Sequence, residues 1–208
     1  MIYLDYAAST PVDEEVLNEF IKVTKENYAN PNSNHELGHQ ALNKINEATS
    51  KIASLLHVNS DEIIYTSGAT ESNNLAIRGT ALRYKNRGKH ILVSSLEHNS
   101  IISSCTALQE NGFEIELIPV TKEGVIDIHC LKQMIRPDTI LVSVCSVDSE
   151  LGLVQPIEQI GELLKQYENI VFHTDASQSI GKVTIDYRNC DLIDRKSTRL
   201  NSSHQIIS

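Results

Sequence analysis

The chain has 208 residues, of which 40% are apolar and 22% charged, and its formal net charge is −9. This length and composition are typical of one large folded domain, or of part of one, and they exclude intrinsic disorder as the default state. Because the chain is acidic and carries no basic patch upstream of residue 194, we expect it to bind no nucleic acid.

The N-terminus and the cysteines indicate a cytoplasmic protein. The opening stretch MIYLDYAAST carries an acid and no basic region, unlike a signal peptide. The longest apolar run, TILVSVCSV (139–147), is too short to cross a bilayer, so we expect no membrane anchor. Cys105, Cys130, Cys145 and Cys190 lie far apart and form no CxxC pair, which favours reduced thiols over a disulfide framework.

Apolar spacing predicts the elements in chain order. A helix is expected over 13–28 and a second over 36–56, where an apolar stripe predicts one buried face: Leu37, Ala41, Ile45, Ala48, Ile52 and Leu55. Strands and helices then alternate. The expected strands are 62–67, 90–95, 113–120, 139–147 and 169–176, and the expected helices are 71–85, 99–112, 126–135 and 156–168. Repeated β-then-α units with continuous apolar strands predict an α/β fold with a mostly parallel sheet.

The loop TSGATESNN (66–74) joins a predicted strand to a predicted helix. Gly68 and Ala69 would let backbone N–H groups approach a ligand, and a helix N-terminus favours an anion such as phosphate. The same residues also fit an ordinary helix cap that uses Glu71, so the residues alone leave both interpretations open. No Gly-Lys-Ser/Thr run is present, so the loop is not a P-loop.

His98 and Asp175 each follow a predicted strand, at the edge where a parallel sheet binds its ligands. In SLEHNS (95–100), His98 is placed for proton transfer or for stacking on a ring, although a lone loop histidine is more often structural. In HTDASQS (173–179), Asp175 closes an apolar strand, where a carboxylate needs a partner to offset desolvation. The cationic ring nitrogen of a cofactor would serve, and a cap on the following turn is the alternative.

The stretch HELGH (35–39) matches the HExxH pattern of zinc proteases. The pattern is short, a glycine within it weakens a helix, and no third ligand stands out downstream. We therefore expect no metal site, and a zinc hydrolase is the weakest alternative.

Six stretches together resemble the cysteine desulfurases, which are pyridoxal-phosphate enzymes of the class V aminotransferase group. They are YLDYAASTP (3–11), NPNSNHELGHQA (30–41), TSGATESNNLAI (66–77), EHNSI (97–101), ELGLVQPI (150–157) and HTDASQSIGK (173–182). The resemblance runs from about residue 2 to 193 in the family's order and spacing. It implies the three-layer αβα large domain of the pyridoxal-phosphate transferases, here incomplete, with an N-terminal segment at 1–15 and a partial large domain at 16–193.

The resemblance also implies a role for each matching residue. Ala69 and Thr70 would hold the phosphate of pyridoxal 5′-phosphate, and His98 would lie over the ring and transfer protons. Asp175 would pair with the protonated ring nitrogen, and Gln178 would donate to the phenolic oxygen. The stretch DSE (148–150) departs from the family's Asn-Asn-Glu: Ser149 stands where an amide normally reaches the phenolic oxygen, so we expect a looser or water-bridged contact there.

Residues 194–208, DRKSTRLNSSHQIIS, depart from the family pattern altogether. The family continues with a Ser-Gly-His-Lys-type segment, whose lysine binds the cofactor covalently. The string here reads as translated sequencing adapter, so we predict a non-native tail on an N-terminal fragment. Lys196 has the wrong neighbours for the covalent role, and none of the four cysteines matches the sulfur-accepting position. We expect the 208-residue chain to be inactive.

For the parent enzyme, the resemblance implies conversion of L-cysteine to L-alanine, with the sulfur left as an enzyme persulfide for iron–sulfur cluster or thio-cofactor assembly. It also implies a homodimer that can pass sulfur to an acceptor or scaffold protein. Two alternatives stay open: another class V enzyme, either a selenocysteine lyase or an aminotransferase, and a non-catalytic relative.

Overall fold

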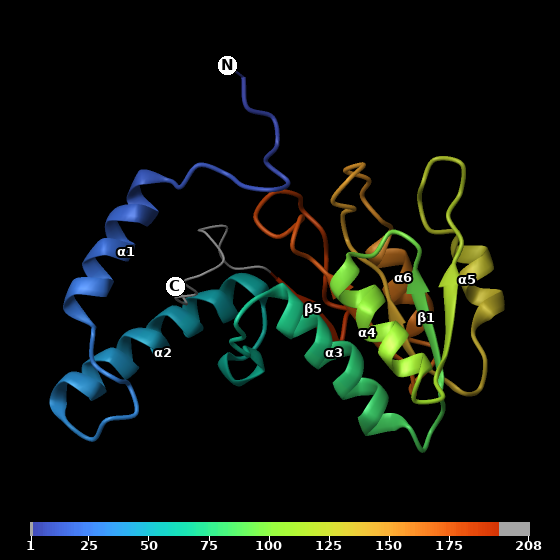
Figure 1. Ribbon diagram of the computed structural model, residues 1–208, viewed down its shortest axis with the longest axis horizontal. Helices are drawn as coiled ribbons and strands as arrows, with labels where there is room; N and C mark the ends of the chain where they lie inside the picture. The colour runs from blue at the N-terminus through green and yellow to red at the C-terminus, as the bar shows by residue number, and fades with distance from the viewer. Residues whose placement is uncertain (1, 196–208) are drawn as a thin grey trace. The chain divides into compact units, whose positions relative to one another are not determined.

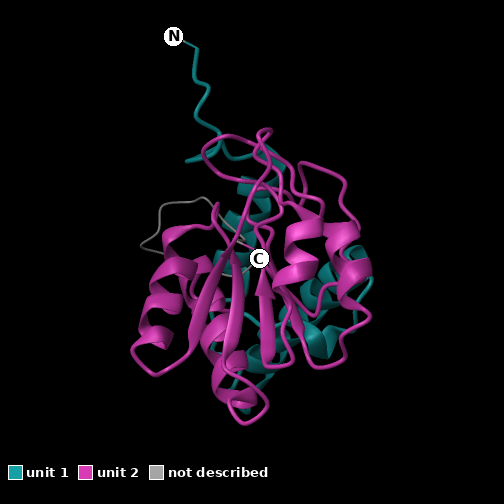
Figure 2. Ribbon diagram, turned by 90° about the vertical axis from the view of Figure 1, so that its right-hand side faces the viewer, with its two compact units in different colours: residues 1–65, 197–208 teal, residues 66–196 magenta. Residues whose placement is uncertain are grey.

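A computed structural model describes residues 2–195 (Figure 1). The described chain divides after Tyr65 into two compact units, 2–65 and 66–195, which Figure 2 colours separately. The domain limits expected at residues 15 and 193 stay predictions. Within the described residues, no helix combines the length and the apolar character needed to cross a membrane.

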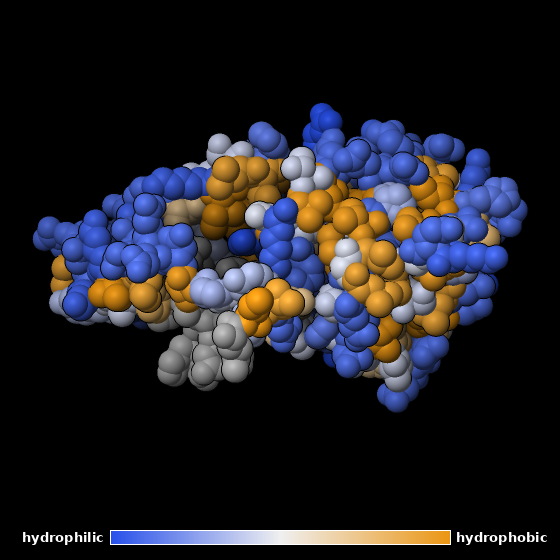
Figure 3. Space-filling model, turned by 90° about the horizontal axis from the view of Figure 1, so that it is seen from above, coloured by the Kyte–Doolittle hydropathy of each residue, from blue (hydrophilic) through white to orange (hydrophobic). Residues whose placement is uncertain are grey.

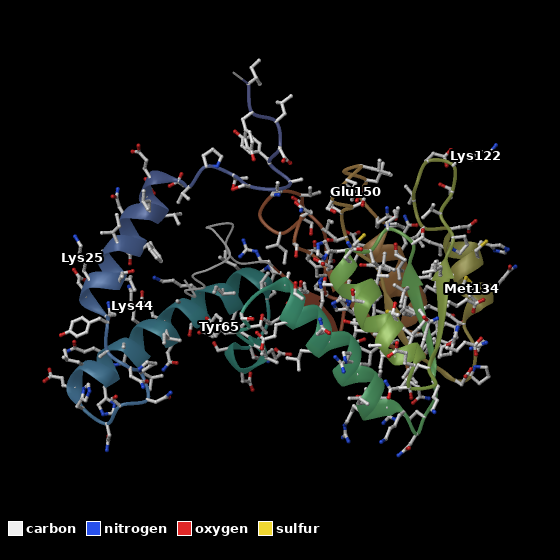
Figure 4. All side chains as sticks on the ribbon, viewed as in Figure 1. Lys25, Lys44, Tyr65, Lys122, Met134 and Glu150 are labelled. Atoms are coloured by element: carbon white, nitrogen blue, oxygen red, sulfur yellow. The ribbon has the colours of Figure 1, made fainter. Side chains whose placement is uncertain are left out.

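The first unit contains α1 (Glu14–Glu26), α2 (Glu36–Leu56) and the short 3-10 helix η1 (Ser60–Glu62). Helix α1 begins where the carboxylate of Asp13 accepts the Glu15 N–H at 2.8 Å, as an N-cap residue does. The two helices are joined by an ion pair between Lys44 Nζ and Glu19 Oε1 at 3.5 Å, and Figure 4 labels Lys44 on α2. Both predicted helices are confirmed.

The predicted buried face of α2 is wrong in large part. Ala41 is buried, but Leu37 is 43% exposed, Ile45 38% and Leu55 80%. Helical spacing shows that these residues share a face, whereas burial depends on what packs against that face. Apolar side chains of α2 are therefore exposed. Figure 3 shows, on the face of the molecule that it draws, orange patches among the hydrophilic residues.

The HELGH stretch forms the start of α2. His35 is the N-cap, and its Nδ1 accepts the Gly38 N–H at 3.1 Å. A Cβ added to Gly38 would lie 2.3 Å from the Ser33 carbonyl oxygen, so this position requires glycine. Helix capping thus explains His35, and close packing explains Gly38.

The strand predicted over 62–67 is wrong. The structure has η1 at Ser60–Glu62 and no strand from there to Ser67. A β-branched run forms a strand only when a neighbouring strand satisfies its backbone groups, and no described segment pairs with this one.

The second unit is a five-stranded parallel sheet in the order β2-β1-β3-β4-β5. The strands are β1 (His90–Ser94), β2 (Glu114–Ile118), β3 (Thr139–Ser143), β4 (Val171–Asp175) and β5 (Leu192–Asp194). The helices are α3 (Ala69–Tyr84), α4 (Asn99–Gln109), α5 (Ile128–Met134) and α6 (Ile157–Leu164). Helices α4, α5 and α6 and the first four strands lie within predicted ranges, whereas α3 begins two residues before the predicted 71–85.

The sheet is covered on both faces, as Figure 2 shows in magenta. Ile91 and Val93 of β1 pack with residues of α3 and α4, whereas Leu92 packs on the opposite face with residues of α5 and α6. Every residue of β1 and β3 is buried, which explains their continuous apolar runs. The predicted three-layer αβα architecture is therefore confirmed.

Candidate active site

The candidate site lies at the carboxyl ends of β1, β3 and β4, which are neighbours in the sheet. Because the strands are parallel, the loops that follow them emerge at the same edge, which is where ligands bind in open α/β sheets. Helix α3 contacts both β3 and β4, and its residue Asn73 reaches Asp175 at the end of β4. Four segments distant in sequence thus contribute to one place.

The start of α3 leaves backbone donors uncovered by a capping side chain. Its N-cap is Gly68, with a φ of 157° that favours glycine, and this residue supplies no side-chain cap. Glu71 instead accepts the Ser67 N–H at 2.5 Å, and hydrogen bonding to Ser67 lowers the pKa of Glu71. Because Ser67 precedes the helix, this hydrogen bond does not occupy the N–H groups of Ala69 and Thr70 in the first turn of α3. Backbone N–H groups at a helix N-terminus can bind an anion.

Asp175 ends β4 and is held from three directions. Its Oδ1 accepts the Ser177 N–H at 2.9 Å, and its Oδ2 accepts from Asn73 Nδ2 at 3.0 Å. Its backbone carbonyl accepts from the amide and the hydroxyl of Ser146, at 2.9 and 3.0 Å. Asn73 stands three residues after Thr70, so the carboxylate contacts α3 one helical turn beyond the anion-binding end.

His98 is the N-cap of α4, with its ring at the surface. Its Nδ1 accepts the Ser100 N–H at 3.2 Å and lies 2.9 Å from Ser100 Oγ. Asn73 Nδ2 also lies 3.0 Å from that hydroxyl oxygen. A continuous hydrogen-bonded chain therefore runs from Asp175 through Asn73 and Ser100 to His98. Asp175 and His98 are residues that the sequence predicts for the site.

Glu97, next to His98, is a half-buried residue whose carboxyl group unexpectedly lies inside the protein. Its Oε1 accepts the Cys145 N–H at 2.6 Å, and its Oε2 is buried with no hydrogen-bond partner among the described residues. Burial, and next the charge of Asp175, raise the pKa of Glu97 to about 8. The carboxyl is therefore largely protonated at neutral pH.

Sequence reasoning missed Asn73 and Glu97. Asn73 precedes the buried Ile77 by four residues, so both lie on one face of α3, and an amide on an apolar face was the available signal. Glu97 directly precedes His98 in the sequence, and only the fold shows that its carboxyl group points into the protein.

Ser149 and Gln178 are in the expected loops but outside the hydrogen-bonded chain just described. Ser149 is exposed in the loop after β3, beside Glu150, which Figure 4 labels. Gln178 lies in the turn after β4, where its Oε1 accepts from Lys182 Nζ at 3.1 Å. The contacts expected from both residues to a cofactor stay predictions.

The four cysteines are free thiols with raised pKa values. Burial raises the pKa of Cys105 and of Cys190 to about 12, and raises that of Cys145 further. Cys130 on α5 is half-buried, and a hydrogen bond with Asp127 raises its pKa. Because the thiolate is the nucleophile, none of these thiols is activated.

The site residues fit a cationic ring that carries an anionic group. Within residues 2–195, no lysine or arginine forms an ion pair with Asp175, so this buried carboxylate suits a positive partner from a ligand. Asn73 Oδ1 and Glu97 Oε2 are also buried without partners in that range. No group of three His, Cys, Asp or Glu side chains able to hold a metal ion occurs in the described part of the chain.

Residues 2–195 match the model of the aminotransferase class-V family. The chain therefore belongs to this family, whose members depend on pyridoxal phosphate.

Among its relatives are cysteine desulfurases. The chain is 43% identical over 185 residues to Cysteine desulfurase IscS of Dictyoglomus turgidum, covering 89% of this chain and 47% of the relative. It is 44% identical over 204 residues to Cysteine desulfurase IscS of Glaesserella parasuis, covering 96% and 50%.

Solved structures of similar fold also match the chain. A NifS-like protein superposes with a TM-score of 0.90 at 32% identity, covering 95% of this chain and 55% of that one. A protein described as SspA in complex with cysteine superposes at 0.87 with 39% identity, covering 95% and 57%. The chain spans about half the length of the curated relatives it matches.

Proposed function

We propose that the edge formed by β1, β3, β4 and the start of α3 binds pyridoxal 5′-phosphate. The hydrogen bond between Asn73 and Asp175 carries this proposal, because it fixes a carboxylate one helical turn from the donors at Ala69 and Thr70. Such spacing suits one small ligand with an anion at one end and a cationic nitrogen at the other. When bound, the cofactor stabilises a substrate carbanion by accepting its electrons.

Each residue then has a defined task. The N–H groups at Ala69 and Thr70 bind the phosphate, and Asp175 keeps the ring nitrogen protonated. His98 would transfer a proton at its imidazole next to the bound cofactor. Gln178 and Ser149 hold the phenolic oxygen, Ser149 more loosely than an amide would.

For the whole protein, we infer a cysteine desulfurase. Support comes from relatives of that name, which match almost all of this chain, and from a related structure in complex with cysteine. The substrate is L-cysteine and the product L-alanine, and the sulfur is left as a persulfide for an acceptor or scaffold protein in iron–sulfur or thio-cofactor assembly. The protein acts in the cytoplasm as a homodimer.

The 208-residue chain alone does not release sulfur from cysteine. Sulfur transfer requires a nucleophilic thiolate, and all four thiols here have raised pKa values. The chain is expected to bind the cofactor reversibly and without the absorbance of a covalent lysine adduct.

Fluorescence titration of the chain with pyridoxal phosphate tests the site. Saturable binding is expected, and Asp175→Asn should weaken it about 10- to 100-fold, because a hydrogen bond to a charged group contributes about 1.5–3 kcal/mol. Asp186→Asn is the matched control, since Asp186 pairs with Arg188 in an exposed loop. Pyridoxal without phosphate should bind far more weakly. Equal affinities for wild type and Asp175→Asn would overturn the proposal.

A further inference from the structure

We propose that Asn73 is a positioning residue that sets the proton arrangement of His98. Its single amide nitrogen lies 3.0 Å from Asp175 Oδ2 and 3.0 Å from Ser100 Oγ. Asn73 is fully buried, so no solvent-exposed atom of this side chain competes for these contacts. The significance for catalysis rests on the function proposed above, whereas the proton arrangement itself does not.

The orientation of the Asn73 amide follows from Asp175. Asn73 Nδ2 lies 3.0 Å from Asp175 Oδ2, and a carboxylate oxygen accepts hydrogen bonds, so the amide atom that faces Asp175 is the nitrogen. That nitrogen has two hydrogens, one for Asp175 and one for Ser100 Oγ. The Ser100 hydroxyl oxygen therefore accepts from Asn73.

The direction of the Ser100 hydroxyl hydrogen follows next. With its oxygen accepting from Asn73, the hydroxyl is directed to donate to His98 Nδ1, 2.9 Å away. The Ser100 backbone N–H, which can only donate, points at the same Nδ1 from 3.2 Å. Neutral His98 thus has a lone pair at Nδ1 and its hydrogen at Nε2, so it presents Nε2 as its proton-donating atom.

Nitrogen NMR of the ¹⁵N-histidine-labelled chain, without cofactor, tests this arrangement. At a pH where the ring is neutral, His98 should give a pyridine-type Nδ1 signal and a protonated Nε2 signal, assigned by their loss in His98→Gln. A protonated Nδ1 in the neutral ring would overturn the proposal.

Three variants test the part played by Asn73. Asn73→Leu keeps the volume of the side chain but removes both donors, and Ser100→Ala removes the hydroxyl. Both should move the Nδ1 signal in the direction of a weaker hydrogen bond, and the double variant should match Ser100→Ala alone, because Asn73 acts through Ser100. Asn74→Ala is the matched control: its amide donates to the Thr70 carbonyl at 2.7 Å, so the His98 signals should not move.

The remaining outcomes are decisive as well. An unchanged signal in Asn73→Leu, or a double variant whose shift is the sum of the two single shifts, would contradict the proposal. Amide dispersion shows whether Asn73→Leu folds. If it does not, Asn73→Ser replaces it, because its single donor cannot serve both acceptors. The Nδ1 signal of His98 should then shift in the same direction. If these NMR results hold while pyridoxal phosphate fails to bind, the proposed function fails and the positioning role stands.

Discussion

Replacing Glu97 by glutamine tests the buried acid beside the site. The glutamine keeps the size of the side chain and an oxygen that can accept from the Cys145 N–H. The pKa of Glu97 is raised from 4.5 to about 8, first by burial and then by Asp175. Between these two pH values the folded state retains a proton that the unfolded state has lost, so folding stability falls as pH rises.

The size of this pH-dependent loss of folding stability follows from the difference between the folded and unfolded pKa values of Glu97. Each pH unit between the two pKa values costs about 1.4 kcal/mol, so wild type loses about 3 kcal/mol of stability between pH 5 and pH 7 through Glu97. Glu97→Gln has no charge to bury and avoids this loss. Its free energy of unfolding relative to wild type should therefore increase by about 3 kcal/mol over that interval.

Urea denaturation at pH 5, 6 and 7 measures the difference. Glu47→Gln is a control of opposite sign: the hydrogen bond from Lys51 lowers the pKa of Glu47, so its small contribution is present at pH 7 and is lost as pH falls. Wild type and Glu97→Gln curves that stay parallel between pH 5 and 7 would refute the burial argument.

Three other substitutions give distinct outcomes. Phe172→Ala, which removes the largest fully buried side chain, should lower the free energy of unfolding by about 3–5 kcal/mol in urea, and a loss below about 1 kcal/mol would contradict the assigned core. Gly38→Ala should destabilise the chain in thermal melts, whereas Gly79→Ala, with no atom within 4 Å of the new Cβ, should be neutral or stabilising; the reverse order would contradict the packing at Gly38. Ser149→Asn should tighten pyridoxal phosphate binding in the fluorescence titration, and unchanged affinity would count against the role of Ser149.

Most of the sheet could be predicted from the sequence because its buried strands are continuous apolar runs. The strands that include Leu92, Val142 and Phe172 were expected within a few residues of their limits. The run over 62–67 has the same local character, yet strand formation depends on a partner, which local sequence does not reveal. The stripe on α2 failed for a similar reason, since spacing defines a face but not what covers it.

The candidate site could be predicted only where residues follow strand ends. Asp175 and His98 stand in such positions, and the parallel topology places the loops that carry them at the same edge of the sheet. Their link through Asn73 and Ser100 depends on how α3 packs against α4, which no single stretch of sequence encodes. The predicted tail at 194–208 lies outside the described residues except Asp194, which ends β5, and Arg195.

The measurement that tests the central claim most directly is ¹⁵N NMR of ring-labelled pyridoxal phosphate bound to the chain. The account predicts a protonated ring nitrogen in wild type at neutral pH, because Asp175 is a buried carboxylate held by Asn73 and Ser177 at the end of β4. It also predicts loss of that protonation in Asp175→Asn. A ring nitrogen that is unprotonated in wild type, or equally protonated in both proteins, would contradict the claim that this edge of the sheet is built for the cofactor.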